Sequence, residues 1–543
     1  MKIVVADKIS PRGLEILRAP GWQVVTPDPN ALTAELAGAS GLIVRSATKV
    51  TAQLLEKADK LRVVGRAGVG IDNVDVQVAT RRGVLVMNTP GGNAVSVAEH
   101  TLALLLSIAR SVPQCNAAIH AGRWEKSSAQ GTEVRGKTLG LVGLGRVGTE
   151  VARRAQALHM TVFAYDPYIS PEAARELDVK LLTLPELFKD SDYISLHAAL
   201  SPATQNLINR DSIAQMKPGV RIINCARGEM IDEAALAEAL REGKVAAAAL
   251  DTFAHEPPKG SPLIGLPNVI ATPHVAGSTA EAQEEVGIQI ALQVREYLQE
   301  GVIRNAVNLP SLSGEQYRRI RPYLDLAERL GSLVAQSIDG RPDRVRIRYG
   351  GETAELGTHV LRSSVLVGIL NRFLDEKVNL VNAAAGAAAR GILVEETIRR
   401  TQRGFPNTIE VTLASDSAEI AAEGTVLANG SPRILRFDGI DVESGLEGTV
   451  LLTRNRDVPG VIGAIGTALG SLGVNIATFA LGRRSATRGA DAVALVRLDG
   501  DANPGIVAKI REIPSITEAR LIELPDARDE NDASSQHSLS FSA

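Results

Sequence analysis

The stretch Leu-Gly-Leu-Val-Gly-Leu-Gly-Arg-Val-Gly, residues 139–148, decides the fold of this chain. Three of its glycines, Gly143, Gly145 and Gly148, follow a short apolar run and stand where a helix is expected to begin. Glycines at this spacing allow a tight turn and let backbone N–H groups approach a pyrophosphate at a helix N-terminus. Asp166 ends the next predicted strand, where a carboxylate accepts the ribose 2′-hydroxyl of NAD and repels the extra phosphate of NADP. The sequence therefore predicts an NAD-binding domain; the alternative is a plain glycine-rich turn followed by a strand-end aspartate.

The regions on both sides of this stretch alternate between strand-like and helix-like runs. Within residues 138–271, six strand-like runs are separated by helical segments, which indicates one doubly wound domain on a parallel sheet. Residues 1–90 show the same rhythm and indicate a second open parallel sheet. Beyond Pro310, residues 311–450 mix helices and strands, and residues 448–524 follow the order βαββαβ. The predicted fold class is α/β, with two Rossmann-like doubly wound domains, then an α+β domain and a ferredoxin-like domain.

Length and composition limit the class of protein. A chain of 543 residues should hold three or four domains. Its 59 Lys and Arg nearly balance its 62 Asp and Glu, giving a net charge of −3, which argues against nucleic-acid partners. Two cysteines cannot staple a chain of this size, so we expect a reducing cytoplasm. Without a run of 18 apolar residues, and with no signal-peptide pattern in Met1–Ser10, we expect no membrane partner.

Three polar residues follow successive predicted strands behind the glycine motif. Arg227 follows the stretch Ile-Ile-Asn-Cys-Ala at the end of one strand, Glu256 follows the next strand, and His274 follows the last. Because parallel strands place ligands at their carboxyl ends, these side chains are expected to meet. An imidazole can take a hydroxyl proton, a carboxylate can orient it, and an arginine can grip a carboxylate with two hydrogen bonds. Singly, each has a plainer interpretation: a structural histidine, a capping arginine or a solvated glutamate.

These stretches resemble a known family. The glycine motif and residues 224–229, 250–258 and 272–279 are similar to the signatures of the D-isomer-specific 2-hydroxyacid dehydrogenases. Residues 44–51, 65–75 and 88–100 resemble the branch of that family that acts on 3-phospho-D-glycerate. The resemblance implies an enzyme that oxidises 3-phospho-D-glycerate to 3-phosphooxypyruvate with NAD, the first step of L-serine biosynthesis.

The resemblance also implies roles for individual residues. Arg227 is expected to anchor the substrate carboxylate, Glu256 to pair with the imidazole, and His274 to act as the acid and base. A further set is expected at the cofactor, beside the three glycines: Arg146, Val147, Asp166, Cys225, Ala226 and Asp251. The substrate cleft is expected to include Val69, Gly70 and Asn93, with Arg45, Ser46 and Arg66 at strand ends as candidates for the substrate phosphate. For Arg45, Ser46 and Arg66 the alternative is that they are ordinary polar residues of the surface. No metal site is expected.

In this family the substrate domain is discontinuous, which implies the following division. Residues 1–98 and 280–310 form the substrate domain, 99–279 the NAD domain, 311–447 an intervening domain, 448–525 an ACT domain, and 526–543 a disordered tail. The ACT assignment rests on Arg456–Arg483, which is similar to that domain. It implies pairing of copies, a homotetramer, and L-serine as an inhibitor held by Asp457 and Asn475. A purely structural dimerisation module is the alternative there. For the whole chain the alternatives are another D-2-hydroxyacid dehydrogenase and an NAD-sensing scaffold without activity.

Overall fold

The structure is a computed structural model that describes residues 1–126, 129–310, 312, 314–374, 378–399, 405, 407–416, 418–499 and 504–526. It divides into two compact units, Met1–Asn88 with Ile290–Ala543, and Thr89–Gln289. Of the predicted disordered tail, all residues after Asp526 lie outside the described residues.

The first unit begins with a five-stranded parallel sheet. Its strands run in the order β2-β1-β3-β4-β5, which is a doubly wound order. They are β1 (Lys2–Val5), β2 (Gln23–Val25), β3 (Gly41–Val44), β4 (Val63–Arg66) and β5 (Leu85–Met87), with helices α1 (Pro11–Leu17), α2 (Leu32–Glu35), α3 (Ala52–Glu56) and α4 (Val76–Arg81) between them. The C-terminal half of α12 (Ala280–Glu300) packs directly on this sheet. Gly65 makes this approach possible, because a Cβ there would lie 2.8 Å from both Ile290 and Val294.

The second unit is built on a seven-stranded parallel sheet. The order β12-β11-β10-β9-β6-β7-β8 reverses between β6 and β9, and such a switch point is where doubly wound sheets bind ligands. The strands are β6 (Thr138–Val142), β7 (Thr161–Tyr165), β8 (Lys180–Leu181), β9 (Tyr193–Leu196), β10 (Val220–Asn224), β11 (Val245–Leu250) and β12 (Val269–Ala271). The sequence predicted six of them; β8 was missed because a two-residue strand leaves no alternating pattern.

Helices cover both faces of this sheet. On one face α5 (Ala94–Arg110) and α7 (Arg146–Ala157) lie side by side and share one apolar core with the strands. On the other face α9 (Leu184–Asp190), α10 (Arg210–Gln215) and α11 (Glu233–Arg241) contribute to a second core. The remaining helices of this unit are α6 (Val112–His120) and α8 (Pro171–Glu176). Two buried layers on one sheet confirm the doubly wound prediction.

The chain continues in the first unit with a six-stranded mixed sheet. The order is β14-β13-β15-β16-β17-β18, with β13 and β14 parallel and the other pairs antiparallel. The elements are α13 (Gly314–Gln336), β13 (Pro342–Gly350), α14 (Thr358–Phe373), α15 (Ala383–Ala389), β14 (Leu393–Arg399), β15 (Thr408–Ser415), β16 (Glu419–Val426), β17 (Pro432–Phe437) and β18 (Ile440–Gly445). Helices α13 and α14 cover one face, and the other carries crossing ion pairs such as Arg348–Glu410 and Arg399–Glu423.

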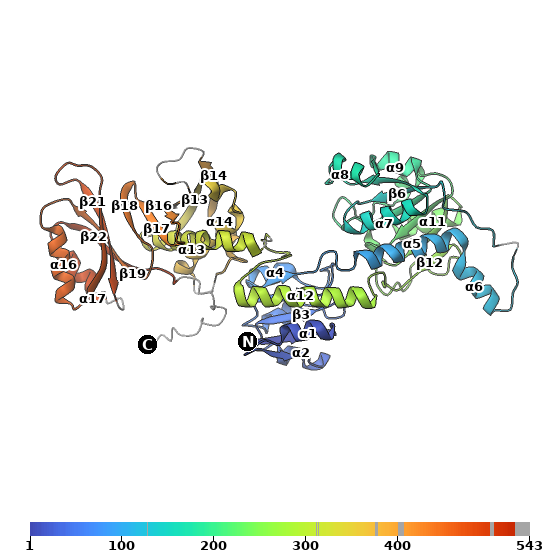
Figure 1. Cartoon of the computed structure of the whole chain (residues 1–543), viewed down its shortest axis with the longest axis horizontal. Coiled ribbons are helices and arrows are strands. Elements are labelled where there is room, and N and C mark those ends of the chain that lie inside the picture. The colour runs from blue at the N-terminus through green and yellow to red at the C-terminus, as the bar shows by residue number, and fades with distance from the viewer. Residues whose placement is uncertain are drawn as a thin grey trace. The chain divides into compact units, whose positions relative to one another are not determined.

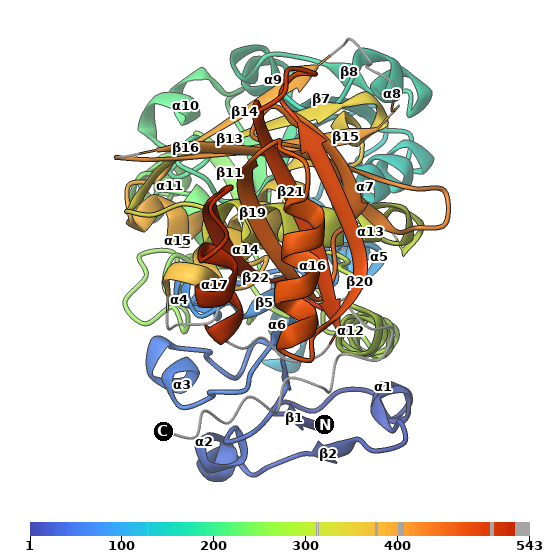
Figure 2. The same cartoon turned by 90° about the vertical axis from the view of Figure 1, so that its left-hand side faces the viewer.

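The last elements form a four-stranded antiparallel sheet in the order β20-β21-β19-β22, which is ferredoxin-like as predicted. They are β19 (Thr449–Arg456), α16 (Val461–Ser471), β20 (Asn475–Arg483), β21 (Asp491–Asp499), α17 (Pro504–Arg511) and β22 (Ile516–Glu523). Helices α16 and α17 cover one face (Figure 2) and pack on Leu451 and Ala494. The opposite face, with Val450 and Leu452, is buried in the core of the six-stranded sheet.

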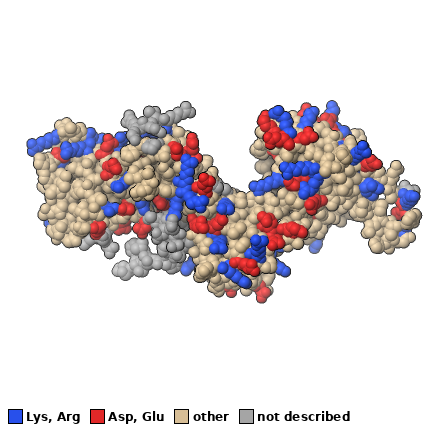
Figure 3. Space-filling view, viewed as in Figure 1, with Lys and Arg blue, Asp and Glu red and all other residues tan. Residues whose placement is uncertain are grey.

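The surface mixes both signs of charge. On the face seen in Figure 3, basic and acidic side chains are interspersed over both units, in keeping with the near-zero net charge. Within the described part of the chain, no single helix has the length and hydropathy needed to span a bilayer; α5 and α6 meet the test only as a pair bent by 65°.

Candidate active site

The glycine motif forms the turn between β6 and α7. Gly143 has a φ of +99°, and a Cβ there would lie 2.8 Å from the backbone of His197 at the end of β9. A Cβ on Gly148 would lie 2.2 Å from the carbonyl oxygen of Gly143. A Cβ on Gly145 would meet nothing within 4 Å, so the turn is open on the side from which a phosphate would approach. Gly143 and Gly148 are thus required because a side chain there would clash with backbone atoms, and Gly145 leaves the turn accessible to a phosphate.

Asp166 and Arg146 flank this turn. Asp166 follows β7, and its carboxylate accepts hydrogen bonds from the N–H groups of Leu144 (2.8 Å) and Tyr168 (2.9 Å). The exposed Arg146 begins α7, next to Val147, and its guanidinium donates to the carbonyl of Pro90. An open glycine turn, a twelve-residue helix that begins there, and a carboxylate at the next strand end fit NAD.

His274 and Glu256 form a hydrogen-bonded pair after β12 and β11. Nδ1 of His274 lies 2.8 Å from Oε2 of Glu256, and both side chains are about half exposed, at 50% and 40%. The other carboxylate oxygen accepts from the N–H of Phe253 (3.2 Å), which orients the glutamate. His274 has a φ of +53°, a left-handed conformation that a non-glycine residue adopts only when its surroundings hold it. The pairing predicted from the sequence is therefore present, and it leaves Nε2 for proton transfer.

Arg227 follows β10, the strand beside β11, in extended backbone. One of its guanidinium nitrogens donates to the carbonyl of Ala226 (2.8 Å). A Cβ on the next residue, Gly228, would lie 1.9 Å from the backbone carbon of Phe253, so the loops after β10 and β11 are in close contact. The three predicted catalytic residues thus follow three adjacent strands at the same edge of one sheet.

Asp251 follows β11 directly and is completely buried. Burial acts to raise the pKa of Asp251, but hydrogen bonds from His100, Thr272 and two backbone N–H groups outweigh this and hold it below its usual value. Cys225 is also buried, which raises the pKa of its thiol to about 12. Cys225 and Ala226 follow β10 and Asp251 follows β11, at the ends of two paired strands.

The predicted substrate residues fall into two groups. Arg45 and Arg66 lie at the ends of the neighbouring strands β3 and β4, where Val44 pairs with Arg66. Asp7 accepts from the N–H of Arg45 (2.6 Å), and Asn88 donates to the carbonyl of Val69 (2.6 Å), so both loops are held in place. Ser46 is exposed and Gly70 half-buried in these loops. Asn93 belongs to the other unit, at the N-cap of α5.

The predicted effector residues do not meet within one chain. Asp457 follows β19 and lies near Arg483 at one end of β20 (3.4 Å), whereas Asn475 begins β20 and donates to Asp499 (2.6 Å) at the other end. A nine-residue strand spans roughly 26 Å between its first and last residues. A small ligand therefore cannot touch both residues of the same chain.

Sequence reasoning missed two histidines of this unit. His197 lies under the glycine turn with Nε2 2.8 Å from the buried hydroxyl of Ser195, and burial lowers its pKa to about 4. His100 lies on α5 with Nε2 3.2 Å from the hydroxyl of Thr272. A signal for the second was available, because Ser96 and His100 form a polar i, i+4 pair on a largely apolar helix. Within the described ranges, no group of three His, Cys, Asp or Glu side chains is placed to hold a metal ion.

Comparison with known proteins agrees with this arrangement. Residues 102–276 match the family model described as the D-isomer specific 2-hydroxyacid dehydrogenase NAD binding domain, and residues 319–438 match that of the D-3-phosphoglycerate dehydrogenase intervening domain. D-3-phosphoglycerate dehydrogenases of Methanocaldococcus jannaschii and Bacillus subtilis are 42% and 39% identical, each over 96% of this chain and 100% of the relative. A glyoxylate reductase from Paecilomyes thermophila is similar in structure, with 28% identity and a TM-score of 0.52 over 56% of this chain and 98% of that one. The chain belongs to the D-3-phosphoglycerate dehydrogenase family of D-isomer-specific 2-hydroxyacid dehydrogenases.

Proposed function

We propose that this chain oxidises 3-phospho-D-glycerate to 3-phosphooxypyruvate with NAD, as the first step of L-serine biosynthesis. The observation that carries the proposal is the 2.8 Å contact between His274 and Glu256, at the same sheet edge as Arg227 and the glycine turn. The names of the relatives support the choice of substrate.

The three side chains divide the work on the substrate. Bound NAD would supply the acceptor for the hydride that leaves the substrate's C2. Nε2 of His274 takes the proton of the C2 hydroxyl, and the carboxylate of Glu256 holds the ring in place and stabilises its protonated form. The guanidinium of Arg227 binds the substrate carboxylate with two hydrogen bonds, which fixes C2 relative to His274. Arg45 and Arg66 supply positive charge for the substrate phosphate, since they end adjacent strands.

The test compares substrates and variants in one assay. Purified protein with NAD should produce NADH with 3-phospho-D-glycerate far faster than with D-glycerate or D-lactate. His274→Ala should lower turnover by about 10²–10⁴-fold while NAD still binds. His159→Asn, which changes an exposed histidine of the same unit, should leave turnover unchanged. Equal rates with D-glycerate would refute the substrate, and normal turnover of His274→Ala would refute the acid and base.

The same substrate series separates the alternatives. Another D-2-hydroxyacid dehydrogenase would prefer a substrate without the phosphate. An NAD-sensing scaffold would bind NAD, by calorimetry, without turning over any 2-hydroxy acid. The presence of a domain that matches the intervening domain of the phosphoglycerate enzymes favours the main proposal over both.

We also propose inhibition by L-serine at paired copies of the ferredoxin-like domain, the predicted ACT domain. Strand β20 is at the edge of its sheet, and antiparallel pairing of two such edges brings Asn475 of one copy beside the partner subunit's Asp457. Serine should slow turnover of the wild-type protein, and Asn475→Ala should weaken that response. An unchanged response in this variant would reject the site.

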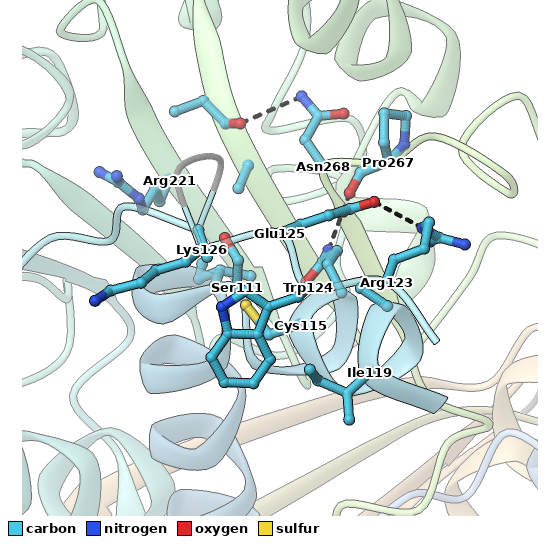
Figure 4. A pocket seen from close by; sticks show the side chains of 16 residues that line it. Ser111, Cys115, Ile119, Arg123, Trp124, Glu125, Lys126, Arg221, Pro267 and Asn268 are labelled. Carbon is cyan, nitrogen blue, oxygen red and sulfur yellow. Dashed lines mark hydrogen bonds and ion pairs between the residues drawn. The ribbon is translucent and has the colours of Figure 1, made fainter. Parts of the chain in front are cut away.

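A homotetramer is the assembly that we infer. An exposed apolar surface near α6 supports contact between copies: Val112, Ile119 and Trp124 are 52%, 54% and 82% exposed. Ile119 and Trp124 also line a pocket of about 500 Å³ (Figure 4), whose lining residues Gln114 and Pro267 are joined by a hydrogen bond. Trp124→Ser should lower the mass measured by light scattering; an unchanged tetramer would place the interface elsewhere.

The cellular location and the domain boundaries follow from the same reasoning. The two unpaired cysteines, Cys115 and Cys225, support a reducing cytoplasm. The division into a substrate domain (1–98 and 280–310), an NAD domain (99–279), an intervening domain (311–447) and an ACT domain (448–525) stays a prediction. Limited proteolysis of the NAD-bound protein should cut between these ranges before it cuts within them.

A further inference from the structure

The turn that carries His274 rests on one face of α5. Three points of contact follow the helix at intervals of three and four residues. A Cβ on Gly277 would lie 2.6 Å from the side-chain nitrogen of Asn93, Ser96 Oγ lies 2.7 Å from Thr279 Oγ1, and His100 Nε2 lies 3.2 Å from Thr272 Oγ1. Helix α5 therefore supports the whole segment from Thr272 to Thr279.

A buried carboxylate completes this support. The oxygens of Asp251 accept hydrogen bonds from the hydroxyl of Thr272 (2.6 Å) and from the N–H groups of Val275 (2.9 Å) and Ala276 (2.8 Å). The backbone carbonyl of Asp251 accepts from the N–H of His274 itself (2.9 Å). Asp251 thus holds the turn on both sides of His274, whose left-handed backbone needs such fixing.

The hydrogen-bond directions place His100 at the end of this chain of contacts. The hydroxyl of Thr272 has one proton, which it donates to Asp251, so Nε2 of His100 must be the donor toward Thr272. The same Nε2 lies 3.5 Å from Oδ1 of Asp251. His100 therefore donates to the pair that fixes the turn and touches neither Glu256 nor Arg227 in the described contacts.

We propose that His100 is a positioning residue, which holds the acid and base His274 in its reactive place through Thr272 and Asp251. This inference rests on the proposed role of His274. Loss of the His100 imidazole lets the turn shift, so proton transfer at His274 slows although NAD and the substrate still bind. Because misplacement of a reacting group lowers the rate of the chemical step more than ground-state affinity, the effect falls on kcat.

The experiment measures kcat, KM and NAD affinity for His100→Ala and His100→Gln. His100→Ala should lower kcat about tenfold, with KM and NAD affinity within about twofold of wild type. The primary isotope effect on kcat with substrate deuterated at C2 should rise, since the chemical step becomes more rate-limiting. His100→Gln, whose amide N–H can replace the Nε2 donor, should restore most of the rate. His159→Asn serves as the control for loss of an imidazole in the same unit.

A second variant keeps the proposal testable if His100→Ala folds poorly. Thr272→Val removes the hydroxyl that links His100 to Asp251, so its effect and that of His100→Ala should not multiply in the double variant. The positioning role would be overturned by any of three results. These are losses of kcat that multiply in the double variant, an unchanged kcat in His100→Ala, and a loss of NAD affinity as large as the loss of kcat. If His274→Ala retains turnover, the proposed function fails instead, and His100 has no acid and base to position.

Discussion

His197 makes the stability of the NAD-binding unit depend on pH. Burial lowers its pKa from the ordinary 6.5 to about 4, so the folded protein keeps this ring neutral while the unfolded chain protonates it. The unfolded chain therefore binds more protons below pH 6.5, and stability falls as the pH drops from 6.5 to about 4. At 1.36 kcal/mol for each pKa unit, the full loss is about 3 kcal/mol, and about 2 kcal/mol of it has occurred by pH 5. The side chain is partly exposed to solvent, so both energies are upper limits.

The assay compares His197→Gln with wild type by calorimetry at pH 7.5 and pH 5. The chain has two compact units, so the transition of residues 89–289 is identified as the one that NAD shifts upward. For a unit of this size, about 2 kcal/mol corresponds to roughly 4–8 °C. We expect the wild-type transition to fall by that much more than the variant's between the two pH values. His159→Asn should behave like wild type. Parallel falls in wild type and His197→Gln would refute the reasoning, because they would mean that the ring titrates equally in both states.

Three further predictions concern other parts of the chain. Because burial raises the pKa of Cys225 to about 12, iodoacetamide at pH 8 should label only the half-buried Cys115 in the native protein; mass spectrometry that finds both labelled would contradict this. Gly148→Ala puts a Cβ 2.2 Å from the carbonyl of the motif's first glycine, so NAD affinity measured by calorimetry should fall more than tenfold; normal affinity would show that the turn can widen. The buried guanidinium of Arg329 donates to two backbone carbonyls, at 2.6 and 3.1 Å. Arg329→Met should therefore lower the unfolding free energy of the C-terminal half by about 3 kcal/mol, measured by urea denaturation. An unchanged denaturation curve would exclude this role.

Much of the fold could be predicted from local sequence signals. Strands of parallel sheets are buried on both faces, so runs such as 138–142 and 247–250 are nearly continuous apolar stretches that stand out. The ferredoxin-like order was equally clear from alternating strands and two short helices. Strands β14, β16 and β18 were missed. β14 has no buried residue, and β16 and β18 carry alanine, glycine or aspartate, which have low strand propensity.

In the candidate site, too, some residues could be predicted from the sequence and others could not. Arg227, Glu256 and His274 could be predicted, because strand ends in a parallel sheet converge whatever the details of the loops. The role of His100 could not, because it depends on which side of α5 faces the segment 272–279, and packing between distant segments decides that. Asp457 lies near Arg483, at the opposite end of β20 from Asn475, and this separation depends on how the strands pair, which no spacing in the sequence reveals.

The core shared by the six-stranded and ferredoxin-like sheets has a consequence for how such a chain can be cut or recombined. Removal of the chain after Leu446 would leave the apolar face opposite Val450 and Leu452 open to water, and expression of the ferredoxin-like part alone would expose the matching face. The six-stranded and ferredoxin-like sheets are therefore expected to be transferable between proteins only together. A shortened or chimeric enzyme should tolerate a junction near Pro310 and reject one near Gly448, and gene fusions that donate this piece to another enzyme are expected to carry both sheets together.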